Sequence, residues 1–277
     1  LTANNDVPLR NFEFELTPPK ISKDNPFPKI ITIPTTAGTG AETEITAMVT
    51  YLKEGMKFCM WHPDARPVLA LVDPELTLGL PPSLTAWTGV DAMVHAIEGY
   101  CVPGFNPLCD GSAIESLSLI SKSLYLAVEE PKNLVARGGM HVGSYLGGVA
   151  FLKGLGLVHA ISHMVGAEFN TQHGLTNAII LPVVLRYNLS GMDEKVKRMS
   201  EAMQFEDHSI EAFITNIEKM LDRLNIPKSL SEIGVPEDCV ERIAKKAMKD
   251  QAYATNPKIA TLEEVKEMTL ASIKKAR

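Results

Sequence analysis

Residues 154–181 read GLGLVHAISHMVGAEFNTQHGLTNAIIL, an apolar stretch that contains three of the chain's seven histidines. His159 and His163 stand four residues apart, which places them one turn apart on the same face of a helix. His173 follows fourteen residues after His159, just past the turn-prone Asn170. Several polar rings in apolar surroundings are costly without partners, so this grouping indicates a binding site.

A second stretch, residues 89–100 (GVDAMVHAIEGY), adds a carboxylate and a fourth histidine at the same helical spacing. Three imidazoles and one carboxylate suit Fe(II), Zn, Ni or Co better than Ca or Mg. We therefore predict that Asp91, His95, His159 and His173 bind one divalent metal. The alternative that the residues alone leave open is a set of separate histidines, each paired with a backbone carbonyl.

Both stretches resemble the iron-containing (group III) alcohol dehydrogenases, and so does IPTTAGTGAE at residues 33–42. The three motifs occur in order, and the likeness runs from about Pro28 to the C-terminus. The resemblance implies that one Asp and three His hold Fe(II), and it maps them onto the four predicted ligands. Zn is the alternative ion, because such ligands bind Zn more tightly than Fe(II). It implies that His163 lies near the nicotinamide and the substrate rather than on the metal.

Composition narrows the class of protein. The chain has 277 residues, 45% of them hydrophobic, which is enough for a buried core. With a net charge of -6 and no dominant basic patch, nucleic acid is not an expected partner. We found no signal peptide and no long apolar span, and therefore expect no membrane association and a cytoplasmic location. Four scattered cysteines without a CxxC pattern are expected to be buried thiols rather than ligands.

Residues 1–83 are predicted to be the remnant of an α/β dinucleotide-binding domain. A short strand is expected at residues 12–16, and buried strands at residues 29–33 and 68–72, where β-branched and apolar residues run together. A hairpin is expected between residues 46–51 and 56–61.

The family resemblance implies contacts with NAD or NADP from seven positions: Thr35, Thr36, Thr39, Thr46, Lys57, Leu76 and Gly79. Many family members have threonine at the position of Glu44, and no cofactor contact is carried over there. They also carry a longer nucleotide-binding half with a Gly-Gly-Gly-Ser phosphate loop, and no such loop occurs in this sequence. This departure leaves open a metal-binding fragment without dehydrogenase activity.

Residues 84–277 are predicted to form an all-α, metal-binding catalytic domain of the dehydroquinate synthase-like type, so the fold class is α+β and multi-domain. Beside the histidine-rich helix, helical periodicity places helices at residues 83–100, 107–128, 131–152, 176–187, 194–203, 210–224, 237–250 and 262–275. Ser83 or Thr85 is the expected cap of the first. His141 is expected to be structural, and His62 and His208 are expected at the surface.

Together these features predict a metal-dependent oxidoreductase that interconverts a small alcohol and its aldehyde or ketone with NAD(P). Apolar residues beside the histidines, including Met164, Val165 and Phe169, favour a small alcohol. A lyase of related architecture, the other enzymatic alternative, would need a basic cluster for an anionic substrate. The family resemblance also implies a homo-oligomer.

Overall fold

The computed structural model describes residues 7–277. The strands are β1 (Ile31–Thr32), β2 (Thr46–Tyr51), β3 (Met56–Trp61) and β4 (Leu69–Ala70). The 3-10 helices are η1 (Leu9–Phe12), η2 (Ala41–Thr43), η3 (Pro63–Ala65), η4 (Pro74–Thr77), η5 (Phe151–Lys153), η6 (Ser231–Ile233) and η7 (Glu237–Cys239). The α-helices are α1 (Pro82–Cys101), α2 (Pro107–Glu129), α3 (Leu134–Ala150), α4 (Leu157–Phe169), α5 (His173–Asn188), α6 (Asp193–Ala202), α7 (Ile210–Arg223), α8 (Val240–Ala247), α9 (Gln251–Ala254) and α10 (Leu262–Lys274).

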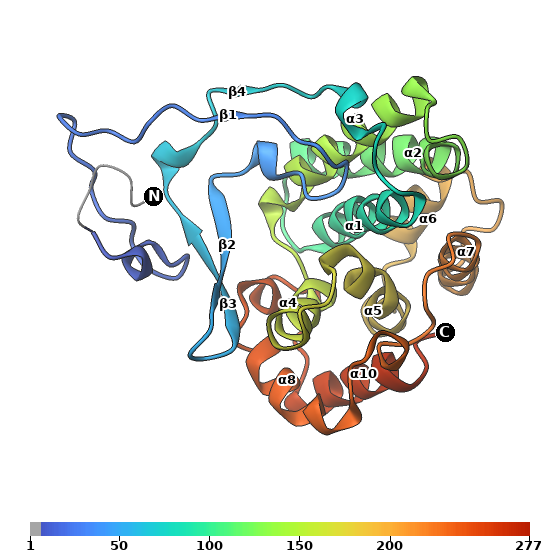
Figure 1. Ribbon diagram of the computed structural model, residues 1–277. Helices are drawn as coiled ribbons and strands as arrows, with labels where there is room; N and C mark the ends of the chain where they lie inside the picture. The colour runs from blue at the N-terminus through green and yellow to red at the C-terminus, as the bar shows by residue number, and fades with distance from the viewer. Residues whose placement is uncertain (1–6) are drawn as a thin grey trace.

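Two small sheets precede a large group of helices, which is the α+β organisation that the sequence predicts (Figure 1). β1 and β4 form a parallel pair, and β2 and β3 form an antiparallel hairpin in which Thr46 faces Trp61. The hairpin packs against α4 through β3, while α1 packs against α2, α3 and α5. The predicted hairpin is therefore confirmed, and it lies beside the helix that carries two of the histidines.

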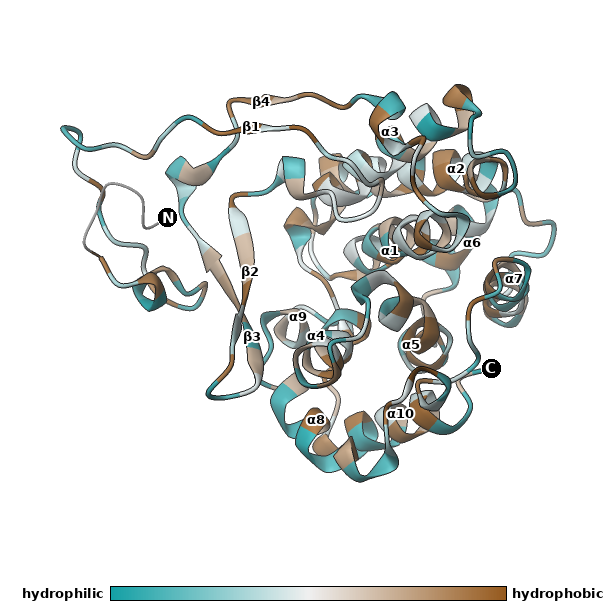
Figure 2. Ribbon diagram, viewed as in Figure 1, coloured by the Kyte–Doolittle hydropathy of each residue, from teal (hydrophilic) through white to brown (hydrophobic). Residues whose placement is uncertain are grey.

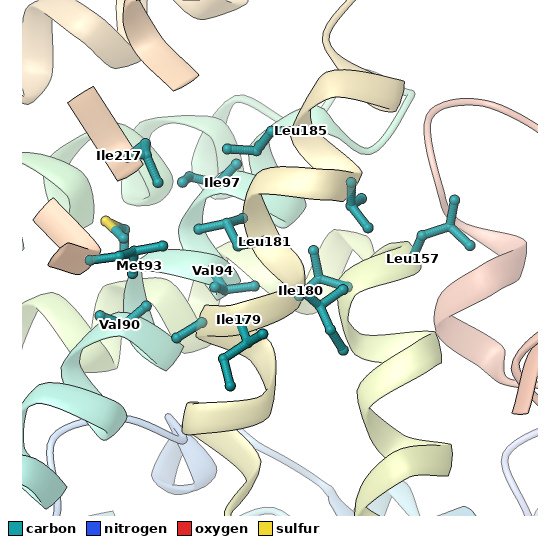
Figure 3. Close-up of a cluster of buried hydrophobic side chains, with 14 of the residues drawn as sticks. Val90, Met93, Val94, Ile97, Leu157, Ile179, Ile180, Leu181, Leu185 and Ile217 are labelled. Atoms are coloured by element: carbon teal, nitrogen blue, oxygen red, sulfur yellow. The ribbon is translucent and has the colours of Figure 1, made fainter. Parts of the chain in front are cut away.

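The core centres on α1, which is buried over most of its length. A helix that is apolar on all faces must be covered on all faces. Here α2, α3 and α5, which all follow α1 in the sequence, cover it. Figure 3 shows Val94 and Ile97 of α1 beside Leu181 of α5, all of them at most 1% exposed. This packing holds two of the site-bearing helices rigidly against each other.

The strands β1 and β4 differ from the prediction. Each is only two residues long, and both are exposed rather than buried: Ile31 is 58% and Leu69 is 52% exposed. A parallel pair is normally covered on both faces, and residues 7–277 provide no such cover. Figure 2 shows the resulting hydrophobic segments along these two extended stretches.

The segment before β1 also differs from the prediction. Residues 12–16 form no strand; Phe12 ends η1, and Glu13 makes only an isolated bridge to Met60. His62 was expected at the surface and is 4% exposed, because the rings of Phe12 and Phe27 pack on its imidazole.

Helix boundaries are corrected at both ends of the helical part. α1 starts at Pro82 without a side-chain cap, since Thr85 instead accepts a hydrogen bond from Arg137. α3 begins at Leu134 rather than at Pro131, because the Asn133 side chain caps it. The helix predicted at residues 237–250 is a 3-10 turn, then α8, and ends before Asp250, which caps α9.

Within residues 7–277, no single helix has the length and apolar character needed to cross a bilayer. α3 with η5, taken together with α4, meets those criteria only as a pair bent by 104°.

Candidate metal centre

The four predicted ligands converge. One side-chain ligand atom from each of Asp91, His95, His159 and His173 lies within 4.8 Å of the other three. The Asp91 Oδ1 atom is 3.7 Å from His95 Nε2, 3.8 Å from His159 Nε2 and 3.7 Å from His173 Nε2. Residues more than eighty positions apart therefore point their ligand atoms at one small volume.

Three helices place these side chains. Asp91 and His95 lie one turn apart on α1, His159 is in the first turn of α4, and His173 is the first residue of α5. The start of α5 fits closely against α1 because residue 174 is glycine: a Cβ there would lie 2.4 Å from the Trp87 carbonyl oxygen. Close backbone approach thus sets the position of His173.

Burial keeps the imidazoles uncharged. It lowers the pKa of His95 and lowers that of His159 well below its usual value, and it lowers the pKa of His173 to about 4 despite the opposing effect of Asp91. A neutral imidazole offers a lone pair to a metal, so the protonation state at neutral pH is the one that coordination requires.

The residues fit a divalent cation. Asp91 is 2% exposed, and within residues 7–277 no lysine or arginine forms an ion pair with it. A buried carboxylate without a cationic partner is costly, and a metal ion held by these four atoms would supply the missing charge. The donor set of three nitrogens and one oxygen matches Fe(II) or Zn.

Glu98 orients His159, a role that sequence reasoning did not assign. His159 Nδ1 is 2.6 Å from Glu98 Oε2, and the other carboxyl oxygen accepts the Val158 backbone N–H. Burial raises the pKa of Glu98 to about 8. A carboxyl group behind a histidine that is to bind a metal fixes the ring orientation. Its position three residues after His95, on the same helical face, was the available signal.

His163 lies beside the cluster but outside it. Its ring centroid is 5.7 Å from that of His159 and 5.4 Å from that of His173. Its Nδ1 atom pairs with Asp250 Oδ2 at 2.9 Å, while Asp250 Oδ1 accepts the Ala252 N–H. The partner of His163 was not foreseen, because Asp250 is 87 residues away in sequence and no spacing rule connects them.

Three of the residues predicted to contact a dinucleotide, Thr35, Thr36 and Thr39, lie in a loop beside α1 and α3. Thr35 and Thr39 are exposed and Thr36 is half-buried. Their loop packs closely on the helices: Gly40 has a φ of 62°, and a Cβ on it would lie 2.7 Å from Gly148 Cα. This contact needs glycine on both sides.

The other four such residues are spread over the small-sheet segment. Leu76 is 45% exposed in η4, and open space surrounds Gly79. Thr46, the first residue of β2, donates a hydrogen bond from its hydroxyl to the Glu44 side chain. Lys57 lies next to α4, and burial lowers its pKa. Their contacts with a cofactor stay predictions.

A cavity of about 340 Å³ adjoins the cluster through Phe151, and none of the four predicted ligands lines it. Phe151 lines it and packs on His95, with ring centroids 4.7 Å apart. Phe14, Ile45 and Trp61 make its apolar wall, and Glu44 adds a carboxyl group. The cavity is of a size for a small organic molecule.

Comparison with known proteins decides the family. The model described as "Fe-containing alcohol dehydrogenase family, C-terminal" matches residues 85–273, and the one described as "Iron-containing alcohol dehydrogenase" matches residues 1–74. The chain belongs to the iron-containing alcohol dehydrogenase family. It is 35% identical over 254 residues to an NAD-dependent methanol dehydrogenase of Bacillus methanolicus, covering 89% of this chain and 67% of that one. It is 37% identical over 252 residues to the lactaldehyde reductase of Escherichia coli (strain K12), covering 88% and 65%.

Solved structures of this family share the fold. A 1,3-propanediol oxidoreductase superposes with a TM-score of 0.86 at 34% identity, covering 90% of this chain and 67% of that one. An alcohol dehydrogenase from Oenococcus oeni superposes with a TM-score of 0.89 at 30% identity, covering 97% and 70%. The chain spans about two thirds of the length of the relatives that it matches.

Proposed function

We propose that this chain is a metal-dependent oxidoreductase that interconverts a small alcohol and its aldehyde or ketone by hydride transfer with NAD or NADP. The observation that carries the proposal is the convergence of Asp91, His95, His159 and His173 on one buried point. Family membership supports it, and the similar methanol dehydrogenase is named NAD-dependent.

The four side chains would hold Fe(II) or Zn. When bound, the cation would act as a Lewis acid toward an alcohol oxygen and the nicotinamide would accept the hydride. Glu98 keeps the His159 ring in position, and Asp91 offsets part of the cation's charge. The apolar cavity beside Phe151 would exclude water from the reacting group and orient a small alcohol.

His163 is the proposed proton acceptor. Asp250 holds its Nδ1 side, so Nε2 is the ring atom left to take or relay the hydroxyl proton. Asp250 thereby favours the tautomer that general-base catalysis needs. Loss of a general base typically slows turnover by about 10²- to 10⁴-fold.

We place dinucleotide contacts in residues 1–83, through the seven positions predicted above, and the metal in residues 84–277. The boundary between them, after residue 83, falls in the first turn of α1. We further propose a homo-oligomer, on the basis of the family resemblance, and a cytoplasmic location, on the basis of the composition.

Two variants test the assignment. His173→Ala is expected to lose both the metal, measured by elemental analysis, and alcohol-dependent reduction of NAD(P). His163→Ala is expected to keep the metal and turn over slowly. His208→Ala is the matched control. The His208 ring contacts the Phe205 carbonyl and is not part of the cluster, so this variant should change neither the metal content nor the turnover.

Full metal content in His173→Ala contradicts the ligand assignment, and unchanged turnover in His163→Ala contradicts the proton role. A titration with NAD and NADP separates the enzyme from a metal-binding fragment without dehydrogenase activity, which would take up metal but no cofactor.

A further inference from the structure

Asn177 occupies the centre of the site although no role has been given to it. It lies on α5, one turn after His173, and is 0% exposed. Its Nδ2 atom is 2.7 Å from Asp91 Oδ1, 3.1 Å from His159 Nε2 and 3.2 Å from His173 Nε2. One amide nitrogen therefore touches three of the four ligand atoms at once.

The hydrogen bonds of this contact can run in only one direction, from Asn177 to its neighbours. An amide nitrogen donates and cannot accept, so both imidazoles present a lone pair to it. These are the lone pairs that a cation would need, so the amide N–H groups and a metal ion compete for the same acceptors. In the arrangement seen here, the amide compensates the buried Asp91 carboxylate.

The other half of the same side chain is unsatisfied. The Asn177 Oδ1 atom is buried and has no hydrogen-bond partner. A buried carbonyl oxygen without a partner costs about 1–3 kcal/mol. Rotation of the amide by half a turn would exchange oxygen and nitrogen with almost no change of shape. The carbonyl oxygen, which can offer an electron pair to a cation, would then lie on the side of the three ligand atoms.

We propose that Asn177 is a positioning residue with two working orientations. Its two N–H groups, shared among three acceptors, hold Asp91, His159 and His173 together, and reversal of the amide would offer its carbonyl oxygen to a bound cation instead. The inference rests on the proposed metal site, and it adds a fifth polar group that adjusts to the occupancy of that site.

Two substitutions separate the functions of the amide. Asn177→Leu removes both the donor and the oxygen, and its affinity for Co²⁺ is expected to fall by about 10- to 100-fold. Asn177→Asp keeps an oxygen but removes the donor. It should lower the melting temperature of the chelator-treated protein, because two carboxylates then adjoin, and should bind Co²⁺ at least as tightly as the wild type.

The measurements are the melting temperature with chelator and with saturating Co²⁺, the Co²⁺ affinity by competition with a chromophoric chelator, and the visible Co²⁺ spectrum, which reports the donor set. Asn188→Asp is the matched control. Asn188 is buried at the end of the same helix but bonds Asn256 instead of the cluster. This control should be destabilised equally with and without metal and keep the wild-type affinity.

Three results would overturn the proposal. The first is that Asn177→Asp binds Co²⁺ as weakly as Asn177→Leu, and the second is that Asn177→Leu keeps the wild-type affinity and spectrum. The third, which applies if the variants do not fold, is an NMR contact in the wild type between the Asn177 amide protons and the His159 ring that persists on addition of Zn²⁺. The expected NMR result is loss of that contact. Failure of the metal-site proposal itself is distinguishable, because the wild type would then bind no Co²⁺.

Discussion

His173 is the predicted ligand at the open side of the cluster, with 30% of its side chain exposed, yet burial still lowers its pKa to about 4 from an ordinary 6.5. Between these values the unfolded chain takes up a proton at this residue while the folded chain does not. The free energy of unfolding should therefore fall as the pH drops from about 6.5 toward 4.

The prediction is that metal-free wild type loses on the order of 1 kcal/mol more stability than His173→Ala between pH 7 and pH 5. Chelator-treated samples unfolded with urea at both pH values give the difference. Glu98, with its pKa raised to about 8, contributes a trend of opposite sign. It is present in both proteins and cancels in the comparison. Equal losses in the two proteins would contradict the shifted titration of His173.

The residue scale also shows what spacing can and cannot predict. The pairs Asp91 with His95 and His159 with His163 are visible as positions one turn apart. Spacing does not tell which histidine of the second pair binds the metal, since both lie on one helical face. In the structure their partners differ: Glu98 lies behind His159, and Asp250 lies behind His163. Only the family resemblance separated the two roles beforehand.

At the scale of elements, the position of α5 on α1 depends on a single missing side chain. A methyl group on Gly174 would lie 2.4 Å from the Trp87 carbonyl oxygen, which is backbone and cannot rotate away. Gly174→Ala should therefore move the start of α5 and the adjacent His173. The expected result is a loss of about 1–3 kcal/mol in stability, with weaker metal binding and unchanged helix content.

Gly111→Ala is the matched comparison, because Gly111 is in the helix α2 and a Cβ there meets nothing within 4 Å. It should stabilise the protein by about 0.5–1 kcal/mol and leave metal binding intact. Urea unfolding and a chelator competition assay measure both effects. A Gly174→Ala variant that behaves like Gly111→Ala would show that α5 can shift without cost to the site.

Element boundaries were predictable where local signals dominate and not where a distant contact decides. The hairpin of β2 and β3 follows from its own alternation and its glycine turn, with Gly55 at a φ of 57°. The predicted helix at residues 237–250 is interrupted because Asp250 must serve two partners, the α9 backbone and His163. The contact of Asp250 with His163 depends on the tertiary structure of the site, so the local sequence does not predict it.

For the whole molecule, the sequence predicted a small sheet portion before a helical portion, and the superposition on family structures confirms that organisation. The prediction that β1 and β4 are buried was wrong. Their composition is that of buried parallel strands, but what covers a strand is a property of the rest of the molecule. Ile31, Ile33, Leu69 and Leu71 are all at least half exposed.

These exposed apolar strands should promote self-association of the chain. Large contiguous apolar surfaces and unpaired strand edges both favour contact with another copy. Ile31→Lys and Leu69→Lys combined are expected to lower the concentration-dependent increase in sedimentation coefficient and to leave the metal content unchanged, because the cluster lies between α1, α4 and α5. Phe105→Lys, at a 94% exposed position in the turn after α1, is the control for adding a surface charge. If the control lowers association as much as the double variant, the effect is one of net charge; if neither does, β1 and β4 are not the contact, and the proposed homo-oligomer must use another face.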